Sequence, residues 1–261
     1  MPRVARETRP RVVRPALDAT AIVLALCAVG GCTSAMPLLA GGSTTHSELA
    51  ALTAGGAARV PLGEARPDER TGEDTLADAA SSGGVVPVVG ARYGVAPHWD
   101  VGVFVAGTEA RLEGRRELVL EDGSTRKALL LGAGLLGGYV DPDGLGDDHP
   151  VSGGRFGAEV PVVYAVEFGP VYDLWVGGRV GTEHLRGQLR PAPSAGGTGL
   201  VDASATNLRA GAVVGLGAGF RRLQAQLEVT AYYQAWVGAP RGTALGNGVV
   251  LVPAFALRVR L

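Results

Sequence analysis

The sequence predicts an all-β protein, a closed antiparallel barrel of about ten strands (8–10) that run up and down. Three observations support this prediction. Residues 223–237 (LQAQLEVTAYYQAWV) alternate without exception between an apolar and a polar set, and a period of two places successive side chains on opposite faces of a strand. Similar segments recur along the chain. The connections between them alternate between short and long.

The length of the 223–237 segment indicates a membrane strand. Its fifteen residues exceed the usual strand of about 5–6 residues. A tilted strand needs roughly 9–11 residues to cross the hydrocarbon core of a bilayer. We therefore expect a transmembrane β-barrel, with the apolar set facing lipid and the polar set facing the lumen.

The first 31 residues have the pattern of a signal peptide. Five arginines within residues 1–14 precede an apolar run at 19–31, which matches a charged region followed by a hydrophobic region. The run is shorter than the about 20 apolar residues of a transmembrane helix. We expect residues 1–31 to be removed on export.

The end of this run, Val29-Gly30-Gly31-Cys32, resembles a bacterial lipobox. The resemblance implies cleavage before Cys32 and acylation of its thiol. The alternative is an ordinary signal peptide with a chance cysteine. Because Cys27 would be discarded, the mature chain keeps one cysteine and forms no internal disulfide. We expect residues 32–45 to be a lipidated N-terminus and tether, and residues 46–261 to be the barrel.

Ten segments are predicted to be strands. Most alternate clearly, whereas 126–140 is apolar on both faces, and 109–120 places Glu109, Arg111, Glu113, Arg115 and Glu117 on one face. The ten predicted strands are 46–61, 84–96, 100–107, 109–120, 126–140, 156–169, 172–189, 204–220, 222–237 and 248–261.

The connections place the strand ends at two different rims. Short connections at 97–99, 121–125, 169–171 and 221–222 alternate with long ones at 63–83, 141–155, 190–203 and 238–247; only the corner at Gly107-Thr108 breaks the rule. Short turns on one rim and long loops on the other are typical of bacterial outer-membrane barrels. With ten strands, both chain ends lie on the short-turn, periplasmic side.

The last strand adds a second signal. In residues 249–261 (VVLVPAFALRVRL), apolar residues occupy alternate positions up to Leu261, which resembles the C-terminal insertion signal of outer-membrane barrels. With the lipobox, the chain thus resembles small bacterial outer-membrane β-barrel proteins. The resemblance implies insertion by the barrel-assembly machinery, contact with membrane lipid, and an outer-membrane location with a periplasmic, lipid-anchored N-terminus. We expect a monomer.

The polar faces of the strands should line the lumen. Unpaired buried ions are costly, so neighbouring Arg and Glu side chains should pair. One interpretation is a lumen filled by salt bridges. The other is a narrow pore, which the inward glycines Gly211, Gly215, Gly217 and Gly219 would favour. The candidate lumen residues are Arg179, Glu159, Glu167, Glu183, Arg209, Glu228, Arg258 and Arg260.

Composition and motifs give no reason to expect an enzyme, a cofactor, a metal ion or a nucleic-acid partner. Without residues 1–31, 19 basic and 23 acidic residues remain, and no phosphate- or dinucleotide-binding motif is recognisable. We therefore expect a structural, interaction or narrow-pore role. One alternative is a periplasm-facing lipoprotein with a soluble β-sandwich. Another is a barrel enzyme, either protease-like through Asp147, Asp148, His149 and His184, or lipid A deacylase-like through Ser152 and His149.

Overall fold

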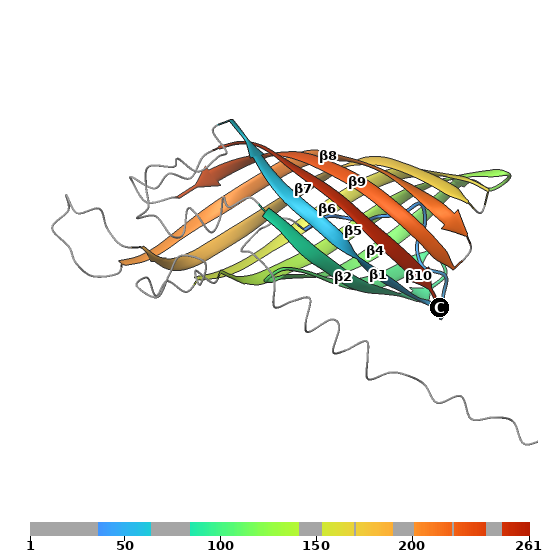
Figure 1. Cartoon of the computed structure of the whole chain (residues 1–261), viewed down its shortest axis with the longest axis horizontal. Helices are drawn as coiled ribbons and strands as arrows, with labels where there is room; N and C mark the ends of the chain where they lie inside the picture. Colours follow the sequence, from blue (N-terminus) through green and yellow to red (C-terminus); the bar gives the residue numbers. More distant parts are fainter. Residues whose placement is uncertain are drawn as a thin grey trace, which may run out of the picture.

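The predicted fold class is confirmed: the chain forms a closed, antiparallel, ten-stranded barrel (Figure 1). The computed structural model describes residues 36–63, 84–140, 153–169, 171–189, 201–220, 222–238 and 247–261. The strands are β1 (Ala50–Leu62), β2 (Gly84–Ala96), β3 (Trp99–Ala106), β4 (Glu109–Glu121), β5 (Thr125–Val140), β6 (Gly153–Phe168), β7 (Tyr172–Leu189), β8 (Val201–Phe220), β9 (Leu223–Val237) and β10 (Gly248–Arg260). Among the described residues, no helix is long and apolar enough to cross a membrane.

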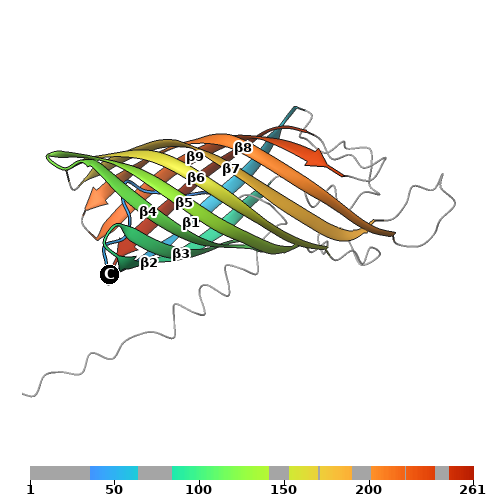
Figure 2. The same cartoon turned by 180° about the vertical axis from the view of Figure 1, so that it is seen from behind.

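The barrel closes between the first and last strands. β1 pairs with β10 from Ala51↔Arg260 to Leu62↔Val249, and each other strand pairs with its sequence neighbours. Figure 2 shows the opposite wall, where β3 to β6 lie side by side. Closure gives each described strand a paired neighbour on both sides, as a barrel in lipid requires. The alternative of a soluble β-sandwich is therefore wrong.

Three strand starts differ from the prediction by three or more residues, and three others differ by one. β1 begins at Ala50 rather than 46, because Glu48 adopts a positive φ of 66° and residues 46–49 form a turn in which Ser47 bridges Gly94. β6 and β8 begin three residues earlier than predicted. Their first residues lack clear alternation but pair with the neighbouring strands, as in Val140↔Gly153 and Leu189↔Val201.

The two faces of the wall differ as the alternation predicts. In β9, Leu227, Val229 and Tyr233 are exposed, whereas Glu228 and Thr230 are buried. Exposed aromatic side chains lie near both rims: Tyr93, Trp99, Phe168, Tyr172 and Phe220 near the short turns, and Tyr139, Phe156 and Tyr233 near the long connections. Aromatic belts of this kind flank the apolar band of membrane barrels.

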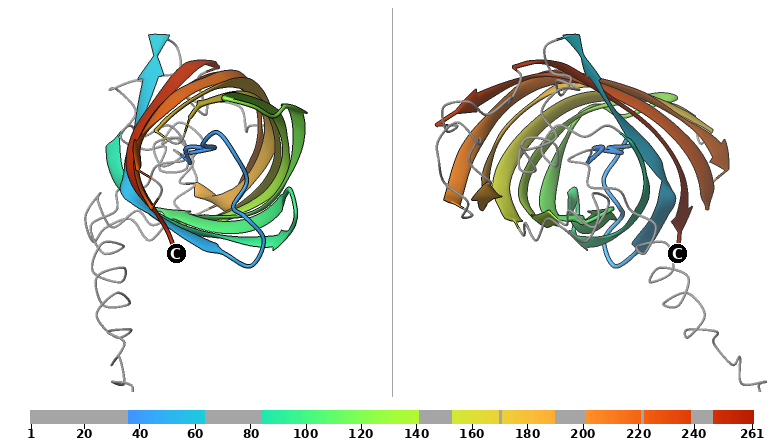
Figure 3. Two further views of the ribbon diagram at one scale, coloured as in Figure 1. Left: turned by 90° about the vertical axis from the view of Figure 1, so that its right-hand side faces the viewer. Right: turned by 60° about the vertical axis from the view of Figure 1, so that its left-hand side comes forward.

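The lumen contains the chain's own N-terminal segment. Residues 36–45, called here the plug, are all buried, and the end-on view shows this segment inside the ring of strands (Figure 3, left). The prediction that residues 32–45 form a tether is thus wrong for the described part of that range. The plug enters the lumen because its apolar side chains and main-chain groups find partners there. Cys32 and the rest of residues 1–35 lie outside the described residues.

The plug has a defined direction. Its first residue, Met36, contacts Arg179, the eighth residue of β7. Its last residue, Thr45, contacts Asp100, the second residue of β3. The chain therefore runs from part-way up the barrel down to the short-turn rim, where residues 46–49 lead into β1. Met36 is therefore the end of the plug that lies deeper in the lumen, and Thr45 is the end at the short-turn rim.

Candidate functional site: the plugged lumen

Acidic side chains of the wall accept hydrogen bonds from the plug's main chain. Glu228 of β9 accepts from the N–H groups of Leu38 (2.7 Å) and Ala40 (3.3 Å). Asp173 at the start of β7 accepts from the N–H of Gly42 at 2.5 Å. Nearer the rim, Glu117 accepts from the N–H of Thr44 (3.2 Å), and Asp100 accepts from the N–H of Thr45 (2.8 Å).

Arginines of the wall donate to the plug's carbonyl groups. Arg111 donates to Pro37 O at 2.8 Å and to Leu38 O at 3.1 Å. Arg92 also reaches Leu38 O at 3.3 Å. The remaining donors are Arg115 to Ala40 O and Arg179 to Met36 O. The wall thus replaces the β-ladder that a strand would use to satisfy these buried main-chain groups.

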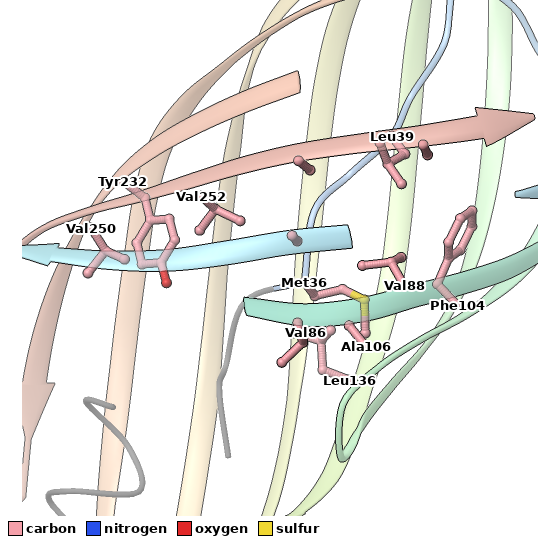
Figure 4. Close-up of a cluster of buried hydrophobic side chains, with 13 residues drawn as sticks. Met36, Leu39, Val86, Val88, Phe104, Ala106, Leu136, Tyr232, Val250 and Val252 are labelled. Atoms are coloured by element: carbon pink, nitrogen blue, oxygen red, sulfur yellow. The ribbon is translucent and has the colours of Figure 1, made fainter. Parts of the chain in front are cut away.

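Apolar side chains of the plug pack on two sides of the lumen. Met36 and Leu39 lie in a cluster with inward residues of β1, β2, β3, β5, β9 and β10, among them Val86, Val88, Phe104, Val250 and Val252 (Figure 4). Leu38 and Ala40 lie in a second cluster with Leu130, Val163, Ala165, Trp175 and Val213. These contacts explain why β5 is apolar on both faces: its inward Leu130 and Leu136 belong to these two clusters.

Two consecutive glycines allow the plug to approach the wall. Gly41 has a φ of +65°, and a Cβ there would lie 2.7 Å from Nη1 of Arg258. A Cβ on Gly42 would lie 2.7 Å from Cβ of Asp173. Side chains are disfavoured at a positive φ, and both distances are too short for a carbon atom. The glycine pair is therefore required for the observed path of the plug.

Ion pairs join the wall charges around the plug. Arg111, whose side chain is fully buried, pairs with Glu113 at 2.8 Å and with Glu159 at 3.1 Å. Arg92 also pairs with Glu113, and Arg179 with Glu159. Arg115 pairs with Asp100 at 2.6 Å. Opposite charges at these distances offset part of the cost of removing each ion from water.

A second charge cluster lies farther toward the long-connection rim. Arg155 at the start of β6 pairs with Glu109 of β4 at 2.5 Å and with Glu183 of β7 at 3.3 Å. Arg209 of β8 reaches the other oxygen of Glu183 at 3.3 Å. In the described part of the barrel, the plug thus fills the lumen toward the short-turn rim, and salt bridges fill it toward the long-connection rim.

The structure places the predicted lumen residues at three levels. Glu228, Arg258, Glu159 and Arg179 surround the plug; Glu183 and Arg209 belong to the outer cluster. Glu167 and Arg260 are less buried and line a cavity of about 470 Å³ at the short-turn mouth. Asp100 and Asp173 were missed. Each is the second residue of its strand, where a single carboxylate after a turn gives little signal of facing inward.

The inward glycines of β8 do not mark a pore. A Cβ on Gly211 would collide with Tyr232, one on Gly215 with the Trp175 ring, and one on Gly217 with Asp173. These glycines therefore make room for large side chains of the neighbouring strands. The interpretation that they favour an open channel is wrong.

The residues considered for catalysis do not come together among the described residues. His184 alternates with the inward Glu183 and Leu185; its Nδ1 lies 3.1 Å from Thr206 Oγ1, and its ring lies 5.2 Å from that of Phe156, on the outer face. Asp147, Asp148, His149 and Ser152 lie outside the described residues. Within the described ranges, no group of three or more His, Cys, Asp or Glu side chains could hold a metal ion.

The closed sheet with an apolar outside and a charged inside has the architecture of outer-membrane β-barrels. No family model and no curated protein matches the sequence. Solved structures with a similar fold include the following three. Neisserial surface protein A has 10% identity and a TM-score of 0.34, covering 81% of this chain and 95% of that one. Ail of Yersinia pestis has 12% identity and a TM-score of 0.35, covering 82% and 99%. The outer membrane protease OmpT of Escherichia coli has 8% identity and a TM-score of 0.42, covering 82% and 96%.

Proposed function

We propose that the protein is a bacterial outer-membrane β-barrel with a structural or interaction role, whose lumen is closed by the plug. The observation that carries this proposal is the exposed apolar surface around the wall, including Leu112, Leu135, Val180, Leu227 and Phe255 on five different strands. Soluble proteins rarely expose continuous apolar patches larger than a few hundred Å². A bilayer would cover this band, with the short-turn rim facing the periplasm.

The filled lumen argues against a diffusion pore as the main role. The plug occupies the lumen toward the short-turn rim, and the salt bridges of Arg155, Glu183 and Arg209 occupy it toward the long-connection rim. In an interaction role, a partner would be recognised at the rims of the barrel or by the wall groups that contact the plug's main chain.

This proposal predicts a barrel that inserts into bilayers but conducts poorly. Purified protein reconstituted in liposomes should keep a folded, fast-migrating band on unheated gels, because its main-chain hydrogen bonds are closed in lipid. Planar bilayers containing the same sample should show no steady ion conductance. A steady open channel in the unmodified protein would contradict the closed-lumen role, and failure to insert would contradict the membrane barrel itself.

We also propose that Cys32 carries a lipid, on the support of the lipobox-like sequence that ends at this residue. Cys32→Ser should abolish incorporation of labelled fatty acid, whereas Cys27→Ser should retain it because Cys27 would leave with the signal peptide. Acylation adds about 0.8 kcal/mol per buried CH₂, so the Cys32→Ser barrel should still insert. Labelling that survives in Cys32→Ser would show that the lipobox prediction is wrong.

A further inference from the structure

We propose that the lumen near the short-turn rim is a binding site for a peptide main chain. The chain's own plug fills this site, and a separate peptide can take the place of the plug. The inference deepens the interaction role proposed above and rests on it. The wall contacts carry it: Glu228, Asp173, Glu117 and Asp100 accept from main-chain N–H groups, while arginines donate to main-chain carbonyls.

Wall donors and acceptors are interspersed along residues 36–40 of the plug, and the N–H groups of Gly42, Thr44 and Thr45 face wall carboxylates. The carbonyls of Met36 and Pro37 face arginines, the N–H of Leu38 faces Glu228, and the carbonyl of Leu38 faces Arg92 and Arg111. The N–H of Ala40 again faces Glu228 and its carbonyl Arg115. Charge-assisted hydrogen bonds are about twice as strong as neutral ones. Such a wall recognises a peptide by its backbone, whatever most of the side chains are.

Side chains define the class of ligand more narrowly. The plug sequence, MPLLAGGSTT, contains no charged residue, and the four arginines that donate to its carbonyls, Arg92, Arg111, Arg115 and Arg179, already pair with wall carboxylates. A charged ligand side chain beside these ion pairs would be buried without a partner of its own. Apolar pockets receive Met36, Leu38 and Leu39, and only glycine fits at positions 41 and 42. The site therefore takes an uncharged peptide with leading apolar residues followed by a glycine pair.

The plug is connected to the barrel in a way that allows this proposal to be tested. Residues 46–49 are exposed and join the plug to β1 at the short-turn rim. A protease recognition sequence inserted between Ser47 and Glu48 can be cut after the full chain has folded. The cut leaves the plug held by non-covalent contacts alone.

After cleavage in detergent, we expect the N-terminal fragment to co-elute with the barrel on gel filtration. An excess of fluorescent peptide with the sequence of residues 36–45 should then replace it in a saturable manner. A peptide with valine in place of Gly41 should fail to compete, while one with alanine in place of Ser43 should compete. A fragment that leaves with no peptide taking its place, or that stays against any excess of peptide, would overturn the proposal.

Two matched variants of the wall test whether the cut fragment is held by hydrogen bonds to the wall carboxylates or is only enclosed by the barrel. Glu228→Gln should release the fragment at least tenfold faster, because Glu228 accepts from two plug N–H groups. Glu121→Gln, which changes an exposed carboxylate outside the lumen, should behave like the parent chain. Equal release from both variants would overturn recognition by the wall carboxylates.

The uncut chain gives a second route if the insertion prevents folding. Gly41→Val should displace the plug and allow the labelled peptide to bind, whereas Gly114→Val should not, since a Cβ on Gly114 meets nothing within 4 Å. Absence of binding to the Gly41→Val chain would overturn the proposal. These readouts are made in detergent, so they are distinguishable from failure of the protein to insert into bilayers or to remain closed.

Discussion

At the scale of single residues, the lumen depends on arginines that act on two partners at once. Arg111 pairs with Glu113 and Glu159 and also donates to two carbonyls of the plug. Its guanidinium lies 5.1 Å from the centre of the Phe104 ring. The planar group with five donors can satisfy such divergent partners, which an ammonium group could not. The plug and the charge network are therefore stabilised by the same side chains.

Arg111→Met tests this arrangement. The substitution leaves Glu113, Glu159 and two plug carbonyls with fewer partners, and breaking a buried pair costs about 3–5 kcal/mol. We expect a loss of that size in the free energy of unfolding, measured by urea titration in liposomes. Lys127→Met is the control, because Lys127 pairs with an exposed Glu121 and such pairs contribute about 0–1 kcal/mol. Similar losses for both variants would show that the buried network does not contribute to stability.

At the scale of secondary-structure elements, the strands follow the sequence closely where alternation is clear. In β9 the predicted odd and even faces are those of the structure. In β5 the alternation is masked, because Leu130 and Leu136 face a lumen that contains apolar plug residues. The inward face of a strand is polar only where water or charged groups meet it. A segment with two apolar faces can thus indicate a filled barrel.

Charge placed on the outer face of β9 should cost most at its middle. Val229 is exposed, close to the centre of the strand, and pairs with Val214 and Pro253. Val229→Arg should destabilise the inserted barrel by about 2–4 kcal/mol, and Leu223→Arg at the rim by about 0–1 kcal/mol. Urea unfolding from liposomes measures both. Equal costs would contradict a lipid-facing outer wall.

Thr230 does not serve as a mild lumen-facing comparison for Val229→Arg. The Thr230 side chain faces the lumen and is fully buried. An arginine there would overlap the packed interior, so both faces of β9 should reject it for different reasons. Comparing Val229→Arg with Leu223→Arg avoids this ambiguity, because both residues lie on the outer face and differ in their depth in the bilayer.

At the scale of the whole molecule, the sequence predicts the barrel but not its contents. Strand number, strand order and the two rims follow from local alternation and connection length. The plug has no period, and Leu38 lies 190 positions from its partner Glu228. The glycine pair and the lack of charge are features that an exposed tether would share. No local sequence pattern therefore distinguishes a segment that fills a lumen from an exposed tether.

The position of the plug ahead of β1 has a consequence for assembly. Its partners are spread over the wall from Arg92 in β2 to Arg258 in β10, and the contact between Thr45 and Arg258 joins residues 213 positions apart. Contacts between residues so distant in sequence form late in folding. The wall around the plug is complete only when β10 pairs with β1. Pairing of β1 with β10 therefore also completes the set of wall groups that holds the plug.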